Sequence, residues 1–129
     1  KLKYLDKWND KRAKHAKTYN DGLKGLPIIT PQVNPQNSHI YHLYIIRTKS
    51  RDKLAEFLKS QGITTGLHYP IPIHLQKAYS GLGYKKGDFP VTEKLSKEIL
   101  SLPMYPELRE KEVEHIYSLI RKFFKNEKI

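Results

Sequence analysis

The sequence predicts an α+β domain in which a small, mostly antiparallel sheet has helices packed on it and is preceded by a long connecting helix. Two patterns in the sequence indicate this class. Residues 40–48 are rich in aromatic and β-branched side chains, which is typical of a strand, whereas residues 113–124 repeat apolar side chains at helical spacing. With 129 residues, the chain is long enough for one domain with one hydrophobic core.

The first predicted element is a helix over residues 2–23. Its apolar stripe consists of Leu5, Trp8, Ala16, Tyr19 and Leu23. Arg12 interrupts this stripe, and Gly22 supplies a stop signal. The helix is long for so small a domain and lacks an obvious cap, which suggests a connector cut from something larger.

A loop and a strand follow. Residues 25–38 are rich in Gly, Pro and Asn and predict an extended loop with at most a short edge strand at residues 28–30. Residues 40–48 predict an interior strand, because both of its faces are half apolar.

The next stretch predicts a strand, helix, strand unit. Ser50 is a candidate cap for a helix with Asp52 in its first turn, and Gly62 closes that helix. The buried stripe is predicted to be Leu54, Phe57 and Leu58. Residues 63–69 predict the second strand.

Residues 70–90 predict a loop, because Pro70 and Pro72 bar regular structure. Thr92 is predicted to cap a short helix that carries Leu95 and Ile99, and residues 101–105 to form a brief strand. The last helix has its apolar face at Val113, Ile116, Tyr117, Ile120 and Phe124.

Composition excludes several classes of protein. No apolar run approaches the ~20 residues that span a bilayer, and no apolar signal-peptide core follows the basic start, so we expect a cytoplasmic protein. The absence of cysteine excludes a disulfide scaffold and any cysteine-based zinc site. The formal charge of +11 calls for an anionic partner, a membrane surface or an acidic neighbour.

The six histidines do not predict a metal centre. His39 and His42 are three apart on a strand and face opposite sides, and two prolines separate His68 from His74 with no carboxylate nearby to complete a ligand set. We therefore expect no metal site.

The surplus charge raises an alternative function, a stand-alone basic nucleic-acid-binding module. Lysines cover much of the first helix and decorate the last one, and Tyr41 and Tyr44 could imitate a base-stacking platform. Against this, the sequence contains no Arg-rich recognition helix, no aromatic RNA-binding strand motif and no zinc module.

The most unusual segment is residues 62–79. Here a strand delivers His68 and Tyr69 into a loop stiffened by prolines, which fixes a proton donor and a phenol in place. Two interpretations remain open from the residues alone: the pair holds polar groups of a ligand, or it only ties down the loop.

Four stretches in a fixed order carry a resemblance. They are Trp8-Asn9 with Arg12, Ala16, Tyr19 and Leu23; His42-Leu43-Tyr44 with Arg51-Asp52 and Leu54; Gly62-Ile63 with His68-Tyr69-Pro70-Ile71-Pro72; and Leu100-Ser101-Leu102-Pro103-Met104-Tyr105-Pro106. In this order they resemble the C-terminal domain of the DegT/DnrJ/EryC1/StrS sugar aminotransferases, fold-type I enzymes that depend on pyridoxal phosphate. Together they cover nearly the whole chain.

The resemblance implies how the chain is organised. Residues 1–24 would be the helix that connects to a missing N-terminal cofactor-binding domain, and residues 25–129 the small C-terminal domain. The Schiff-base lysine is expected in the missing domain, because no lysine here lies in the family's context for that role. We therefore expect no catalytic residue in this chain, pyridoxal phosphate bound mainly elsewhere, and no activity from the chain alone.

The resemblance also implies a substrate. The segment from His68 to Pro90 is similar to enzymes that transfer an amino group, from glutamate, to the C3 keto group of a dTDP-linked or UDP-linked sugar. By this resemblance, His68 and Tyr69 bind the substrate, with His74 on the same loop as a further candidate. The family implies a homodimer, with neither nucleic acid nor a membrane as partner.

Overall fold

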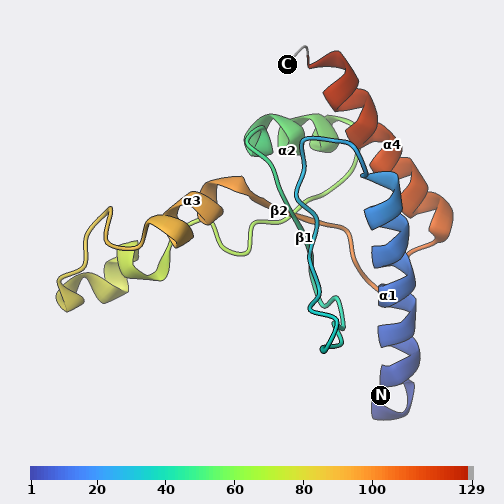
Figure 1. Ribbon diagram of the computed structural model, residues 1–129, viewed down its shortest axis with the longest axis horizontal. Helices are drawn as coiled ribbons and strands as arrows, with labels where there is room; N and C mark the ends of the chain where they lie inside the picture. Colours follow the sequence, from blue (N-terminus) through green and yellow to red (C-terminus); the bar gives the residue numbers. More distant parts are fainter. Residues whose placement is uncertain (128–129) are drawn as a thin grey trace.

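The computed structural model describes residues 1–127 and has the predicted α+β architecture (Figure 1). Its helices and strands are α1 (Leu5–Gly22), β1 (Tyr44–Arg47), α2 (Arg51–Ser60), α3 (Pro90–Glu98), β2 (Ile99–Leu102) and α4 (Glu110–Asn126), with single 3₁₀ turns or short 3₁₀ helices at Leu2–Tyr4, Ile73–Leu75 and Lys77–Leu82. The α1 helix confirms the long N-terminal helix of the prediction.

Strands β1 and β2 form an antiparallel pair in which Tyr44 lies opposite Leu102 and Arg47 opposite Ile99. The predicted interior strand 40–48 is shorter than expected. Tyr41 adopts a φ of 49°, in the left-handed region, and extended backbone cannot continue through it.

Single antiparallel bridges extend the pair at both edges. Ile29 bridges to Arg47, and Gly66 bridges to Ser101. The predicted strands at residues 28–30 and 63–69 are thus reduced to one bridge each. Pro27 and Pro31, two residues to either side of Ile29, lack the N–H groups that would continue the first ladder.

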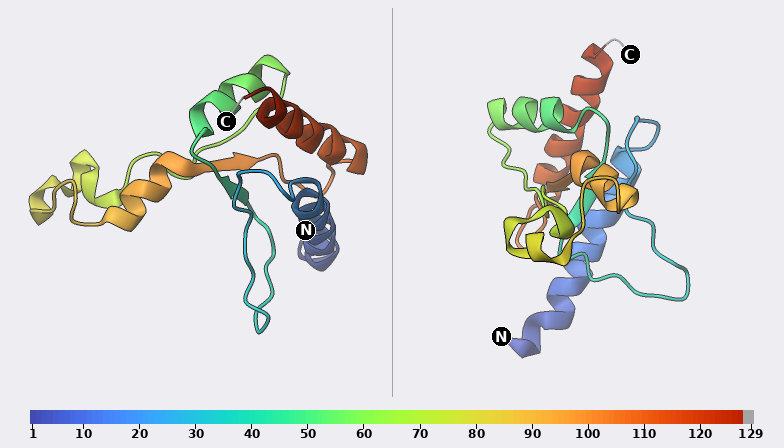
Figure 2. Two further views of the ribbon diagram at one scale, coloured as in Figure 1. Left: turned by 45° about the horizontal axis from the view of Figure 1, so that its top comes forward. Right: turned by 90° about the vertical axis from the view of Figure 1, so that its left-hand side faces the viewer.

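Helices α1 and α4 lie side by side and cover the sheet together with α2 (Figures 1 and 2). The largest fully buried side chains are Tyr19, Tyr44, Leu23, Ile46, Leu54, Leu58, Leu100, Ile120 and Val113. Part of the predicted stripe of α1 is wrong: Leu5 is 42% exposed and Trp8 only half-buried. The first turns of α1 extend beyond the sheet, so only the C-terminal half of the helix reaches the core (Figure 1).

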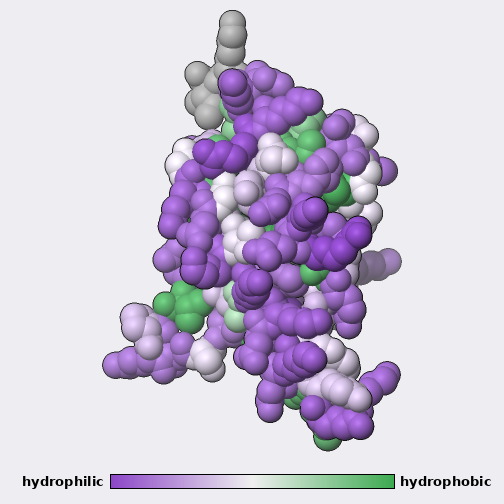
Figure 3. Space-filling view, turned by 90° about the vertical axis from the view of Figure 1, so that its right-hand side faces the viewer, coloured by the Kyte–Doolittle hydropathy of each residue, from purple (hydrophilic) through white to green (hydrophobic). Residues whose placement is uncertain are grey.

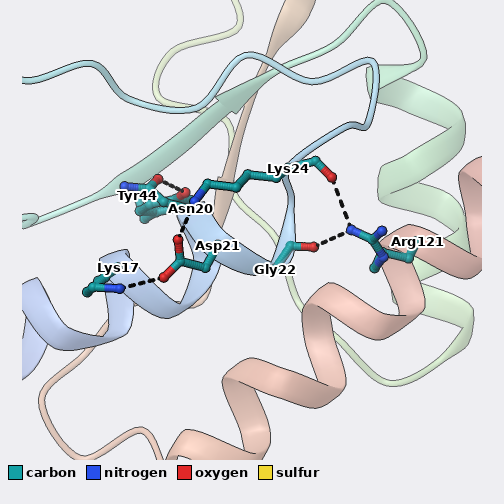
Figure 4. Close-up of polar contacts among 7 residues, drawn as sticks. All are labelled: Lys17, Asn20, Asp21, Gly22, Lys24, Tyr44 and Arg121. Carbon is teal, nitrogen blue, oxygen red and sulfur yellow. Dashed lines mark hydrogen bonds and ion pairs between the residues drawn. The ribbon is translucent and has the colours of Figure 1, made fainter.

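Polar contacts fix the C-terminal end of α1 to its neighbours (Figure 4). Arg121 Nη1 of α4 donates to the carbonyl oxygens of Gly22 at 2.8 Å and Lys24 at 3.2 Å. The Tyr44 hydroxyl of β1 donates to Asn20 Oδ1 at 2.6 Å. Helix α4 therefore satisfies carbonyls that the end of α1 leaves without an intrahelical partner.

Of the two predicted helix caps, Ser50 is confirmed in position but not in its capping bond, and Thr92 is wrong. Ser50 holds the N-cap position of α2, but its φ and ψ of −88° and 25° lie outside the extended region, and its side chain makes no capping bond. Thr92 lies inside α3, because Pro90 occupies the first turn, where its fixed φ and missing N–H suit a helix start. Ile99 belongs to β2 instead of this helix.

Helices α1 and α4 approach each other closely at Gly22, where an added Cβ would overlap the Tyr117 ring. We expect Gly22→Ala to lower the free energy of unfolding by about 1–3 kcal/mol, because the two helices must move apart. Urea denaturation followed by circular dichroism measures this. The matched control is Gly81→Ala, which adds its methyl group to open space and should be near neutral. Equal stability of the two variants would contradict the close approach.

Stability should also depend on pH through His15, which is 7% exposed and whose Nε2 has no partner. Burial lowers the pKa of His15, while the Pro106 backbone acts weakly in the opposite direction. The unfolded chain therefore binds this proton more readily, and the folded state loses stability as the pH falls below about 6.5. Chemical denaturation between about pH 7.5 and 5.5 measures the slope.

Replacement of His15 by Gln should flatten that slope, because a neutral amide cannot titrate. The control is His115→Gln, at an exposed position on α4. This variant should keep the slope of the unmodified chain. A His15→Gln variant with an unchanged slope would rule out His15 as the source.

Candidate functional site

The candidate site begins where the chain leaves the edge of the sheet. Gly66 exchanges two backbone hydrogen bonds with Ser101 of β2, at 2.8 and 3.0 Å. The half-buried His68 ring then turns back toward the same strand, with Nδ1 2.8 Å from Ser101 Oγ. An added Cβ at Gly66 would overlap the His68 ring, so glycine makes room for this fold-back. Ser101 thus holds both the backbone and the side chain of this segment.

Tyr69 has the opposite orientation and is 73% exposed. Its ring meets the edge of the His68 ring at a centroid separation of 5.6 Å, and the peptide bond between the two residues is cis. Pro70 and Pro72 follow, with fixed φ angles. The structure therefore brings His68 and Tyr69 together, with one ring anchored and the phenol presented to solvent.

His74 occupies a different environment, since it is 9% exposed. Its Nε2 lies 3.0 Å from Glu93 Oε1, and its ring packs against Phe89 at a centroid separation of 4.7 Å. The same Glu93 oxygen accepts the backbone N–H of Gly87 at 2.8 Å. These contacts favour an anchoring role for His74 within the loop.

The Glu93 carboxylate is held ionised by these neighbours. The Gly87 N–H, and then His74 and the Phe89 backbone, lower the pKa of Glu93 against the opposing effect of burial. One carboxylate thereby fastens two parts of the loop to the start of α3. Sequence reasoning missed Glu93, whose only signal was an acid in the first turn of a predicted helix.

The described residues do not fit a pyridoxal phosphate site of their own. All lysines among residues 1–127 are exposed, including Lys111 at a hollow of about 650 Å³ between α4 and residues 62–64. The nearby Glu112 cannot serve a pyridine nitrogen, because it accepts hydrogen bonds from the Arg109 guanidinium and backbone N–H. These contacts lower the pKa of Glu112 to about 2.

The base-stacking platform considered for Tyr41 and Tyr44 is absent from the structure. Tyr44 is fully buried and stacks on Tyr19 with ring centroids 4.8 Å apart, so its face is closed to a nucleotide. The face over α1 and α4 is largely hydrophilic, with small separate apolar areas (Figure 3). Some of its lysines are neutralised locally, as Lys14 is by Glu110 at 3.3 Å.

Residues 1–127 offer neither a membrane-crossing helix nor a metal-binding cluster. None of the helices in this range is both long and apolar enough to cross a membrane. Within the same range, no group of three or more His, Asp or Glu side chains is arranged to hold a metal ion.

Known proteins resemble this chain in sequence and in fold. The chain is 43% identical over 98% of its length to a "Pleiotropic regulatory protein" of Geobacillus stearothermophilus, and 37% identical over 95% to the "dTDP-3-amino-3,4,6-trideoxy-alpha-D-glucose transaminase" of Streptomyces venezuelae. It spans 35% and 33% of these relatives, about a third of their length.

A solved structure shows the same fold. The crystal structure of DesV from S. venezuelae, in complex with a ketimine intermediate, superposes with a TM-score of 0.93 at 36% identity, over 99% of this chain and 34% of that one. The model of the DegT/DnrJ/EryC1/StrS aminotransferase family matches residues 1–121, which include every residue of the candidate site. This chain therefore belongs to the DegT/DnrJ/EryC1/StrS aminotransferase family.

Proposed function

We propose that this chain is the C-terminal domain of a pyridoxal-phosphate-dependent aminotransferase that moves an amino group from glutamate to the C3 keto group of a dTDP-linked or UDP-linked sugar. The family match over residues 1–121 carries the proposal, supported by a relative named as a dTDP-amino-sugar transaminase. In this proposal residues 1–24 connect to a cofactor-binding domain, and residues 25–129 are the small domain. The proposal includes a homodimer, as the family resemblance implies, and a cytoplasmic location, as expected from the sequence.

The proposed task of this domain is to bind the sugar substrate. The exposed Tyr69 phenol donates a hydrogen bond to a sugar hydroxyl or a phosphate oxygen. His68, held by Ser101, fixes the start of the loop and offers its remaining ring nitrogen to the same ligand. Pro70 and Pro72 reduce the entropy lost when the loop becomes ordered around the substrate.

His74 belongs to the same proposed substrate loop but acts differently. Its burial against Glu93 and Phe89 supports a role in holding the loop in shape. The Schiff-base lysine is supplied by the cofactor-binding domain, because no described lysine lies in a suitable pocket. When bound there, the cofactor supplies the electron sink for amino transfer.

The purified 129-residue chain should not retain pyridoxal phosphate. Its described lysines are exposed and lack the enclosed carboxylate and phosphate donors that a specific site needs. We expect the absorbance spectrum after incubation with the cofactor and dialysis to match that of the chain alone. A visible band that survives dialysis with one cofactor per chain would contradict the proposal that a separate domain binds the cofactor.

Tyr69→Phe tests the proposed substrate contact in the full-length enzyme. Loss of the hydroxyl should raise KM for the keto sugar roughly tenfold, the effect of one hydrogen bond to a charged or polar ligand group. Stopped-flow measurement of the glutamate half-reaction should show little change. Tyr84→Phe, which alters another exposed tyrosine of the loop, is the control. An equal loss in both half-reactions would refute a role specific to the sugar.

A further inference from the structure

Residues 68–89 form an arm that projects from the sheet and returns through α3 (Figures 1 and 2). Most of its large side chains are exposed, among them Ile71, Ile73 and Leu82. Among residues 68–89, all of which the structure describes, only His74 is buried. The arm therefore has little hydrophobic burial to hold its shape, and its order must come from other contacts.

Glu93 provides these contacts. Its Oε1 atom lies 3.0 Å from His74 Nε2, on the outgoing part of the arm, and 2.8 Å from the N–H of Gly87, on the returning part. The side chains of His74 and Glu93 are only 7% and 13% exposed, so water competes weakly for the contact. Phe89 packs on the His74 ring and covers one of its faces.

The segment that carries Tyr69 is thereby fixed at both ends. At one end His68 bonds to Ser101 of β2, and at the other His74 bonds to Glu93 of α3. Helix α3 runs directly into β2, so both anchors belong to one continuous stretch of the framework. Only residues 69–73 lie between the anchors, and two of these five are prolines. The backbone that carries Tyr69 is thus held on both sides by a polar contact.

We propose that Glu93 is a positioning residue, which clamps the two sides of the arm and so fixes Tyr69 for binding of the nucleotide-linked sugar. The clamp itself follows from the geometry, whereas its effect on sugar binding rests on the proposed function. Glu93 acts through His74 and the arm, without touching the substrate.

Limited trypsinolysis of the 129-residue chain tests the clamp. Lys77, Lys85 and Lys86 place cleavage sites on the arm. Glu93→Ala should speed cleavage there about tenfold, because both hydrogen bonds are lost. Glu93→Gln, which keeps one acceptor oxygen, should be cleaved at a rate between that of Glu93→Ala and that of the unmodified chain. Glu114→Gln, at an exposed position on α4, is the control and should cleave like the unmodified chain, with unchanged circular dichroism in all variants.

The double variant Glu93→Ala with His74→Ala adds a test of coupling. If the two residues form one clamp, the double variant should cleave no faster than Glu93→Ala alone. The clamp would be overturned if the rate increases of the two single variants multiplied in the double variant. It would also be overturned if the arm of Glu93→Ala resisted trypsin as well as that of the unmodified chain.

Kinetics of the full-length enzyme test the positioning role. Glu93→Ala should raise KM for the keto sugar about tenfold and leave the glutamate half-reaction within about twofold, with partial rescue by Glu93→Gln. A loosened arm with an unchanged KM would overturn the positioning role. An enzyme that aminates no keto sugar would refute the proposed function and this role with it, while the trypsin result would still decide the clamp.

Discussion

The fold depends on helices that cover a sheet too small to be stable by itself. Strands β1 and β2 have four residues each, and a two-stranded pair of that size is not stable in water. Its stability comes from α1, α2 and α4, which bury its apolar face. At the centre, Tyr19 of α1 stacks on Tyr44 of β1, and both hydroxyls are hydrogen-bonded, to Pro103 O and Asn20 Oδ1. Burial raises the pKa of both phenols, so they remain neutral donors.

This arrangement also explains how the candidate site gains rigidity without a core of its own. β2 is buried between β1 and the Gly66 bridge, and its Ser101 is among the buried polar residues. A hydroxyl in such a place needs a partner, and His68 supplies it. The loop is therefore fastened to a buried strand of the sheet, and the cost of leaving Ser101 unpaired favours the folded-back position of His68.

The elements with strong local signals were predictable from the sequence. The apolar repeat of α4 and the helix end at Gly62 are both confirmed, because each depends on residues close together in the chain. The true extent of the α1 stripe was not predictable, since it depends on where α4 crosses the helix. The reason why Arg12 interrupts the stripe was not predictable either, because its Nε donates to Ile40 O of a distant loop, at 3.1 Å.

In the candidate site, too, local features were predictable from the sequence and contacts between distant residues were not. His68 and Tyr69 stood out through the prolines that follow them, and their role as substrate-binding residues remains a prediction. The contacts that hold the loop join residues far apart in the chain, such as His74 with Glu93 and His68 with Ser101. No periodicity or spacing reports such pairs, because a single ring nitrogen and a single carboxylate leave no pattern along the sequence.

The close meeting of Gly22 with Tyr117 has a consequence for how the domain is made. The two residues are separated by most of the chain, and the side of α1 that faces α4 stays uncovered until α4 is made. Contacts of such long sequence separation slow folding, because a large loop must close before they form. During synthesis, α1 and β1 leave the ribosome well before α4, so the nascent chain exposes the α4-facing side of α1 for longer than a domain built from local contacts would.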